Sequence, residues 1–436
     1  MPYPAPVIIV PGITATELRD EYILPPDTVW SAALHKDYTR IALHPDNLRY
    51  DAVEPARIMP DHIFEIAYKE LMNELRYNLK EKADEPVPVF LFAYDWRQPL
   101  ELIEKQLGLY VDEVIERTKL LKHYYNDGYA NNPKVNLLAH SMGGLIVTGY
   151  LQRMGKTSRV AKVATLATPF QGSFEAIVKI STGTSSLGGD APSSREREFV
   201  RLCPSVYQLL PSCDGINVAP GSGLPADIFN PGIWQPSILQ TLKEYCRLHT
   251  VHPNDAGEQA KTLFDNLLST AKNHRDRINS FKLEQADLTT NDWLCVVGVD
   301  SETRVRVNVK KTGNDPDFDF SSKDMENKWG DGATPKARCL TGDGTVPFDG
   351  AIPTFLGLDN IVCVTDDDFG YWEVQDRLLA KVSGFHGILP NMDMLHRLIV
   401  RHFTGRDDTR DSTWGRRAPG VAQTKWHPPL PLKDKT

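Results

Sequence analysis

The sequence predicts an α/β fold, in which a mostly parallel central sheet is flanked by helices and interrupted by an inserted cap or lid subdomain. Short runs of β-branched and apolar residues alternate with segments of helical periodicity, as in parallel sheets with helical crossovers. This alternation breaks over residues 171–290, a segment long enough to form a subdomain. The chain of 436 residues can hold one large domain with such an insertion, or two domains.

Six apolar runs are expected to form the strands of the sheet. They are VIIV at 7–10, VPVFLFAY at 87–94, KVNLLAH at 134–140, VATLAT at 163–168, WLCVVGV at 293–299 and IVCV at 361–364. A helix should follow the second run, because its apolar residues recur on one helical face. These residues are Ile103, Leu107, Val111, Val114 and Ile115. Helices are also expected at 142–154 and, closing the core, at 391–403.

These elements divide the chain into four expected parts. They are a first core segment at 1–170, a cap at 171–290, a second core segment at 291–405 and a tail at 406–436. Residues 20–60, rich in proline, aspartate and aromatics, read as an excursion from the core, and 311–336 as a polar loop. The cap begins irregularly, with GTSSLGGDAPSS, and turns helical around 236–280. The tail is expected to wrap the surface or to be disordered.

Composition restricts the classes of partner. A net charge of −8, from 49 basic and 57 acidic residues, argues against broad binding to nucleic acid. No apolar run approaches the roughly 18 residues that span a bilayer, and MPYPAPVIIVPG lacks the features of a signal peptide. We therefore expect a cytoplasmic protein, with secretion left open. Transient contact with a lipid interface and the oligomeric state also stay open.

Cysteines and acidic clusters give no sign of a metal or cofactor. The six cysteines form no C-x-x-C pair, which favours free buried thiols over disulfides. Cys203 and Cys213 are the pair best spaced to close a small loop. The adjacent Asp366, Asp367 and Asp368 are typical of a solvated loop, so neither a metal nor a cofactor is assigned.

A candidate nucleophile lies in A-H-S-M-G at 139–143, between a predicted strand and a predicted helix. A serine on such a tight strand-to-helix turn needs small residues two before and two after it, here Ala139 and Gly143. Ser141 is therefore the predicted nucleophile, and the alternative is an ordinary helix N-cap. The N–H of Met142 is then expected to stabilise an oxyanion, together with that of Ile13 in V-P-G-I-T, with Thr14 next in line.

Serine needs a histidine base and an orienting carboxylate, in the chain order Ser, Asp or Glu, His. His386 in G-F-H-G-I-L-P is the predicted base, because His396 and His402 fall in a helix and His427 in the tail. Asp343 in T-G-D-G-T-V-P is the predicted acid. Its competing interpretation is a plain turn, and its competitor is Asp300.

With these residues in hand, the chain resembles the lecithin–cholesterol acyltransferase and lysosomal phospholipase group of α/β-hydrolases. The matching strings are V-P-G-I at 10–13, Y-D-W-R at 94–97, A-H-S-M-G-G at 139–144, A-T-P-F-Q-G-S at 167–173, P-S-V-Y-Q-L-L-P at 204–211, G-D-G-T-V-P at 342–347 and H-G-I-L-P at 386–390. The resemblance implies the same triad and the same oxyanion donors. Two departures weaken any transfer of a specific substrate: no cysteine precedes Cys203 to clamp an early lid loop, and alanine stands at 139.

We therefore expect a serine ester hydrolase, a lipase or esterase, that acts on a small-molecule or lipid ester with an apolar chain. An acyltransferase or phospholipase would use the same triad, and a non-catalytic lipid-binding protein is the alternative of another class. Apolar cap residues either form an acyl pocket or simply pack the cap. They are Phe174, Ile177, Val178, Ile233, Trp234, Ile238, Leu239 and Leu242.

Overall fold

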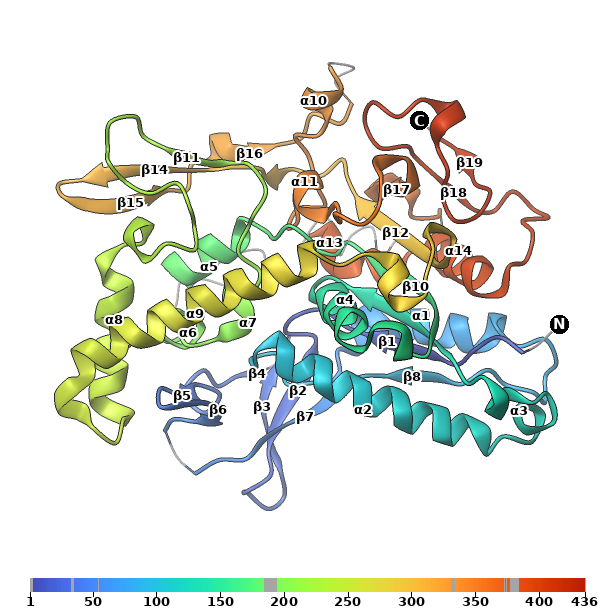
Figure 1. The fold of residues 1–436 in the computed structure, drawn as a ribbon, viewed down its shortest axis with the longest axis horizontal. Coiled ribbons are helices and arrows are strands. Elements are labelled where there is room, and N and C mark those ends of the chain that lie inside the picture. Colours follow the sequence, from blue (N-terminus) through green and yellow to red (C-terminus); the bar gives the residue numbers. More distant parts are fainter. Residues whose placement is uncertain are drawn as a thin grey trace.

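A parallel sheet lies at the centre of the molecule (Figure 1). The computed structural model describes residues 3–32, 35–53, 55–183, 194–330, 334–371, 373, 375–376 and 384–435. Among these residues the central sheet has six strands in the order β17-β12-β10-β9-β1-β8, and every pair is parallel. The strands are β1 (Val7–Val10), β8 (Val89–Leu91), β9 (Val135–His140), β10 (Val160–Leu166), β12 (Trp293–Gly298) and β17 (Ile361–Val364). All six predicted strands are confirmed, the second in shortened form, and so is the fold class.

Helices cover both faces of this sheet, which explains why its strands are apolar on both sides. Alternate residues of a strand point to opposite faces, so Ile8 and Val10 of β1 join one core, and Val7 and Ile9 join the other. The first core contains α2 (Leu100–Lys119) and α4 (Met142–Met154); the second contains α1 (Glu65–Asn78) and α14 (Asp393–Thr404). The predicted apolar face of α2 is confirmed as buried.

Residues 20–60 contribute to the packed core, so their interpretation as a mere excursion is wrong. With the preceding strand they form an antiparallel sheet in the order β4-β3-β2-β7, beside the small hairpin β5-β6. These strands are β2 (Thr16–Asp20), β3 (Asp27–Ser31), β4 (His35–Lys36), β5 (Leu43–His44), β6 (Asn47–Asp51) and β7 (Ile58–Ile63). Val29, Trp30 and Ile41 are buried. The strands are too short and too proline-rich to show a clear period, and pairing across the segment stabilises them.

The cap region contains α5 (Glu175–Thr182), α6 (Ser194–Val200), α7 (Pro204–Tyr207), β11 (Ile216–Val218), α8 (Pro236–His249) and α9 (Ala256–Asn279). The helices expected around 236–280 are confirmed, whereas most of GTSSLGGDAPSS, residues 184–193, lies outside the described residues. Strand β11 pairs with β14 (Val307–Thr312), and β14 with β15 (Asp315–Asp319). The polar-loop interpretation is therefore wrong for this hairpin. In Figure 1 the hairpin lies with α8 at the end of the molecule away from both termini.

Short elements complete the described chain. They are α3 (Lys122–Asn126), β13 (Thr303–Arg304), β16 (Met325–Glu326), α10 (Pro335–Arg338), α11 (Phe348–Ala351), α13 (Phe385–Ile388), β18 (Trp414–Gly415) and β19 (Lys433–Asp434). The tail was expected either to wrap the surface or to be disordered, and the structure shows the first outcome. The Trp426 Nε1–H donates to Ile361 O of β17 at 2.9 Å, and the Trp414 Nε1–H donates to Asp368 at 2.8 Å. Asp368 is thus buried, which makes the solvated-loop interpretation wrong for this residue.

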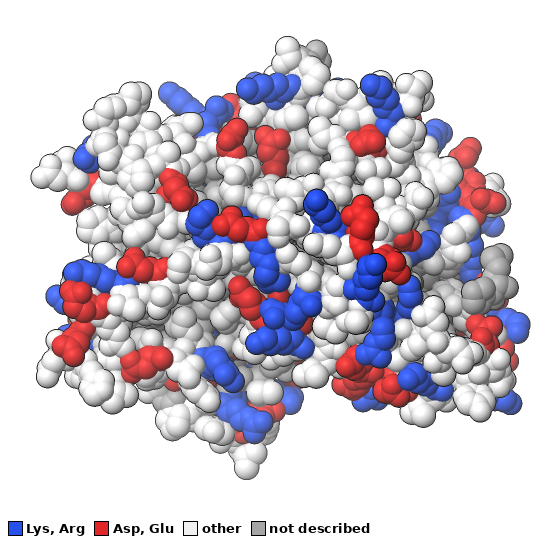
Figure 2. All heavy atoms as spheres, viewed as in Figure 1, with Lys and Arg blue, Asp and Glu red and all other residues white. Residues whose placement is uncertain are grey.

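The face of the molecule in Figure 2 shows basic and acidic side chains interspersed, with no broad field of one sign. Within the described part of the chain, no helix is both long enough and apolar enough to cross a membrane. The six cysteines, including Cys203 and Cys213, are free thiols, as the sequence favoured.

Candidate active site

Ser141 occupies a strained turn between β9 and α4. Its φ of 53° and ψ of −129° are rare for a residue other than glycine. The crowding around it explains the small residues of the motif: a Cβ on Gly143 would lie 2.3 Å from Val10 O, and one on Gly12 would lie 3.0 Å from Ser141 Cβ. The chain is therefore pressed against β1 here, and the neighbouring structure holds the serine in its strained conformation.

His386 meets this serine from the other end of the chain. It lies in α13, and its Nε2 is 2.9 Å from Ser141 Oγ. Its backbone N–H donates to Asp343 O at 3.0 Å, so the histidine is attached to the residue that also contacts its ring. Both Ser141 and His386 are largely buried, with 5% and 9% of their surfaces exposed.

Asp343 completes the predicted set. Its Oδ2 lies 2.7 Å from His386 Nδ1, and its Oδ1 accepts the backbone N–H groups of Thr345 at 3.0 Å and Val346 at 2.7 Å. A carboxylate oxygen only accepts here, so the His386 proton sits on Nδ1 and Nε2 is free to accept the Ser141 hydroxyl proton. A Cβ on Gly298 of β12 would lie 2.6 Å from Asp343 Cβ, so this approach requires a glycine.

The competing residues lie elsewhere. Asp300 accepts a hydrogen bond from Asn327. His396 and His402 are buried in α14 and contact the backbone oxygens of Pro390 and Val163, while His427 is exposed. The structure thus brings Ser141, His386 and Asp343 together and leaves the other candidates in packing or surface positions.

The two predicted oxyanion donors flank Ser141. Met142 follows it as the first residue of α4, where a backbone N–H has no carbonyl one turn earlier to receive it. Ile13 follows Gly12, the residue that packs on the Ser141 side chain. The N–H of Gly12 itself donates to the Tyr68 hydroxyl at 3.0 Å. Thr14, the second choice for this donor, has a positive φ of 63°.

Two buried side chains that sequence reasoning missed lie behind these residues. His140 places Nδ1 at 2.6 Å from the Tyr68 hydroxyl and Nε2 at 3.0 Å from His386 O. Burial, followed by the charge of His386, lowers the pKa of His140 well below its usual value. The place of His140 next to Ser141 was a usable signal, whereas Tyr68 of α1 is distinguished by nothing in its local sequence.

A narrow cavity of about 20 Å³ adjoins the loop after β1. Its wall is largely apolar and is built by the antiparallel sheet, the cap and that loop. The lining residues are Ile13, Thr14, Trp30, Tyr38, Trp96, Lys179, Glu196, Phe199, Val200 and Val206. The eight cap residues considered for an acyl pocket are absent from this wall; seven of them are buried in the core and Leu239 packs against it. Their burial favours the alternative interpretation, as packing of the cap.

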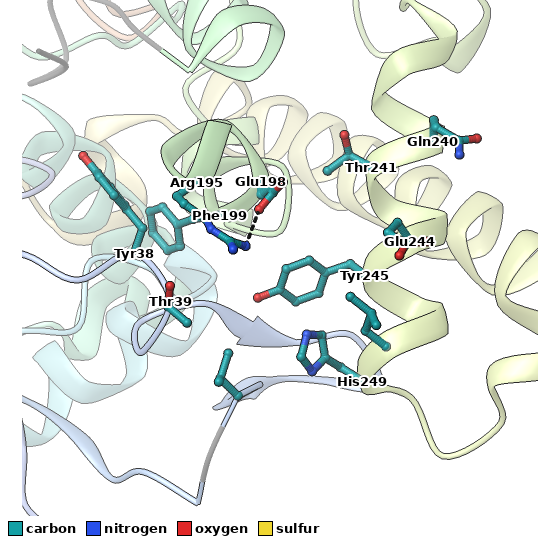
Figure 3. A pocket seen from close by; sticks show the side chains of 12 residues that line it. Tyr38, Thr39, Arg195, Glu198, Phe199, Gln240, Thr241, Glu244, Tyr245 and His249 are labelled. Atoms are coloured by element: carbon teal, nitrogen blue, oxygen red, sulfur yellow. Dashed lines mark hydrogen bonds and ion pairs between the residues drawn. The ribbon is translucent and has the colours of Figure 1, made fainter. Parts of the chain in front are cut away.

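A larger cavity of about 350 Å³ lies beyond the narrow one (Figure 3), and neither Ser141 nor His386 is a lining residue of either cavity. Tyr38 and Phe199 line both cavities, and their ring centroids are 5.8 Å apart. Its remaining lining is mixed, with the Arg195–Glu198 ion pair on one side and Tyr245 of α8 on the other. These two aromatic rings thus lie between an outer cavity of mixed lining and an apolar inner one.

Solved structures resemble this fold at low sequence identity. The crystal structure of the Tle4–Tli4 complex matches with a TM-score of 0.56 and 16% identity, over 80% of this chain and 89% of that one. Mature lipase BlEst2 of Bacillus licheniformis gives 0.22 and 17% over 46% and 58%; the lin2722 product of Listeria innocua gives 0.20 and 14% over 65% and 97%. Only the first score is high enough to bear on the fold. No curated protein sequence matches significantly.

A match to a protein-family model shows the family to which the chain belongs. The model described as lecithin:cholesterol acyltransferase matches residues 62–282, about half of the chain. This range contains α1, the Ser141 turn and most of the cap. The chain therefore belongs to the lecithin:cholesterol acyltransferase family and is an α/β-hydrolase of the lipid-ester hydrolase or acyltransferase type.

Proposed function

We propose that this protein is a serine carboxylic-ester hydrolase, with Ser141 as nucleophile, His386 as general base and Asp343 as the carboxylate that orients it. One observation carries the proposal: the contacts Ser141 Oγ–His386 Nε2 of 2.9 Å and His386 Nδ1–Asp343 Oδ2 of 2.7 Å form a continuous hydrogen-bonded chain. That is the arrangement a weakly nucleophilic hydroxyl needs in order to lose its proton as it attacks.

The proposed reaction is acyl transfer in two halves. Ser141 Oγ attacks the ester carbonyl while its proton moves to His386 Nε2, and the N–H groups of Met142 and Ile13 donate to the oxyanion. His386 then gives that proton to the leaving alcohol, and the acyl group stays on Ser141. Water loses a proton to His386 as it attacks the acyl-enzyme, and His386 returns that proton to Ser141 Oγ as the acid is released. Each oxyanion donor contributes about 3–4 kcal/mol in comparable sites.

The acyl group of the substrate is proposed to be apolar. Trp30, Trp96 and Val206 give the narrow cavity an apolar wall, and Ile13, a proposed oxyanion donor, belongs to the same wall. An acyl chain whose carbonyl oxygen faces Ile13 would therefore have an apolar surface within reach. At about 20 Å³ the cavity has room for little more than one water molecule, so it would receive only the first carbon of an acyl chain unless its wall moves.

An acyltransferase is the second candidate, favoured by the family to which the chain belongs. Its chemistry is identical up to the acyl-enzyme, which an acceptor alcohol then resolves in place of water. The proposed oxyanion donors and triad serve both reactions, so the identity of the acceptor distinguishes them.

The experiment that tests the proposal is hydrolysis of p-nitrophenyl esters from acetate to palmitate, by the wild type and by Ser141→Ala. The exposed Ser269, whose hydroxyl donates to Asn266 O of its own helix, gives a matched control in Ser269→Ala. We expect activity in the wild type and the control and none above background in Ser141→Ala. Equal activity in all three contradicts the proposal. Acyl transfer to an added long-chain alcohol at the expense of free acid would identify an acyltransferase, and an inert wild type would favour lipid binding.

A further inference from the structure

Three buried hydrogen bonds connect the loop after β1 to the residue proposed as the base. The Gly12 N–H donates to Tyr68 Oη at 3.0 Å, Tyr68 Oη lies 2.6 Å from His140 Nδ1, and His140 Nε2 lies 3.0 Å from His386 O. Tyr68 and His140 expose only 2% and 5% of their surfaces. The connection therefore runs through the protein interior, behind the Ser141 turn.

The direction of every bond in this chain follows from the chemistry of its ends. A backbone carbonyl only accepts, so the proton of His140 sits on Nε2 and donates to His386 O. Neutral His140 then has a bare Nδ1. Because Tyr68 Oη already accepts the Gly12 N–H, its own proton donates to that Nδ1. Burial disfavours charge on both rings, lowering the pKa of His140 and raising that of Tyr68.

We propose that Tyr68 and His140 are positioning residues that hold the Gly12–Ile13 loop and the His386 loop in register with Ser141. This inference rests on the proposed function. Tyr68 fixes the amide of Gly12, which leaves the next amide, that of Ile13, to face the oxyanion. His140 fixes the carbonyl of His386, whose N–H is already held by Asp343 O at 3.0 Å.

One consequence is that a single pair of side chains contacts both loops. Small displacements of reacting groups have large effects on rate, since the geometry of attack is demanding. Loss of these three hydrogen bonds should therefore weaken stabilisation of the tetrahedral intermediate more than binding of the ester. The expected signature is a fall in kcat with little change in KM.

The first test is Tyr68→Phe, which keeps the ring and removes the hydroxyl. We expect kcat to fall about 10- to 100-fold, less than the 10²–10³-fold loss for removal of an oxyanion donor, with KM within about threefold. The affinity for an alkyl boronic acid, which forms a tetrahedral adduct on serine, should fall in parallel. Tyr124→Phe is the matched control. Its buried hydroxyl donates to Pro4 O at 2.7 Å, far along the chain from the site, and its kinetics should equal the wild type.

The second test separates the two ends of His140. His140→Gln retains an N–H for His386 O, and His140→Asn retains only an acceptor for Tyr68, so the Gln variant should keep more activity. Because the hydrogen bonds through Tyr68 and His140 act together, adding Tyr68→Phe to His140→Gln should leave activity within about threefold of Tyr68→Phe alone. Losses that multiply instead would mean independent packing effects and would overturn the inference.

A third readout needs no substrate. Nitrogen-15 NMR of histidine-labelled protein, with His140 assigned by its loss in His140→Gln, should show a neutral ring protonated on Nε2. A cationic or Nδ1-protonated His140 overturns the inference. In the kinetic assay, full activity of Tyr68→Phe beside an inactive Ser141→Ala overturns this inference alone. Activity that survives Ser141→Ala overturns the proposed function and this inference with it.

Discussion

The Asp343 carboxylate divides its two oxygens between two tasks: Oδ2 lies 2.7 Å from His386 Nδ1, and Oδ1 accepts the backbone N–H groups of Thr345 and Val346. The backbone N–H groups hold the carboxylate in place through Oδ1, and the contact of Oδ2 with His386 Nδ1 fixes the tautomer of the imidazole. The side chain is almost entirely buried, with 1% of its surface exposed. Its orientation is therefore set by the fold before any substrate arrives.

This division makes Asp343→Asn a selective change. The amide oxygen can still accept from Thr345 and Val346, so the loop should fold normally. The amide N–H₂ then faces His386 Nδ1, so the imidazole proton moves to Nε2. A protonated Nε2 cannot accept the proton of the Ser141 hydroxyl. We expect kcat to fall about 10⁴-fold, the loss that the same substitution causes in serine proteases.

The control for this change is Asp300→Asn, because Asp300 follows β12 but contacts Asn327 and not His386. Its ester hydrolysis should stay within about twofold of the wild type, given that surface-type changes away from the reacting groups have small effects. A large loss in Asp300→Asn together with a small one in Asp343→Asn would reverse the assignment of the acid.

Gly143→Ala tests how tightly the Ser141 turn is packed. The added Cβ would lie 2.3 Å from Val10 O and 2.7 Å from Pro11 O, and both atoms belong to backbone that cannot rotate away. We expect the free energy of unfolding to fall by about 3 kcal/mol or more, because overpacking against backbone exceeds the usual cost. Activity should be lost along with the turn.

Urea unfolding monitored by circular dichroism measures this loss. Gly330→Ala provides the comparison, since a Cβ there meets nothing within 4 Å, and its stability should match the wild type or exceed it slightly. If Gly143→Ala proved as stable and active as Gly330→Ala, the close approach of α4 to β1 would be refuted.

Phe199→Ala tests the apolar cavity. Removing this ring opens the partition that Phe199 and Tyr38 form between the two cavities. We expect the preferred acyl chain to lengthen, with acetate hydrolysis unchanged, although truncating a buried ring costs about 3–5 kcal/mol of stability. The measurement is kcat/KM across the ester series, below the melting temperature of the variant. Leu242→Ala, also buried but not a lining residue of either cavity, should keep the wild-type profile. A shift in this variant instead would place the acyl pocket at the apolar cap residues around Leu242.

His402 makes stability depend on pH. Burial and the neighbouring Lys162 lower the pKa of His402 from 6.5 to about 3. Below pH 6.5 His402 binds a proton in the unfolded chain but stays neutral in the folded protein. The free energy of unfolding therefore falls as the pH falls towards 3. The slope is about 1.4 kcal/mol per pH unit, which amounts to about 2 kcal/mol by pH 5.

Replacing His402 with glutamine removes this titration but keeps a donor for Val163 O, which His402 Nε2 contacts at 3.0 Å. Urea midpoints measured from pH 8 to pH 4.5 should therefore fall less steeply in His402→Gln than in the wild type, while the two curves run parallel above pH 7. Parallel curves over the whole range would show that His402 titrates alike in the folded and unfolded chains.

The sequence allowed the parallel sheet and the three interacting residues to be predicted because their signals are local. A fully buried parallel strand reads as an apolar run, as VIIV does, and a nucleophile turn needs small residues at fixed positions, as A-H-S-M-G has. The bracketing of Asp343 and His386 by glycines also lies within a few residues of each. These features can be recognised in the sequence without any knowledge of long-range contacts.

What could not be predicted depends on pairing between distant segments. The partner of β2 is β7, about 40 residues on, and β11 pairs with β14 across the whole of α8 and α9. Neither pairing leaves a periodic pattern in such short strands. The same holds for Tyr68, whose contact with His140 joins α1 to the end of β9. The cavity wall was missed for this reason, because Trp30 and Tyr38 come from the segment interpreted as an excursion.

The role of Ser141 as nucleophile is measured most directly by the site of labelling by a long-chain fluorophosphonate, mapped by peptide mass spectrometry. We predict one phosphonyl adduct on the peptide containing Ser141, formed much more slowly in His386→Ala and absent in Ser141→Ala. Labelling of a different residue, or equal labelling of the wild type and Ser141→Ala, would contradict it.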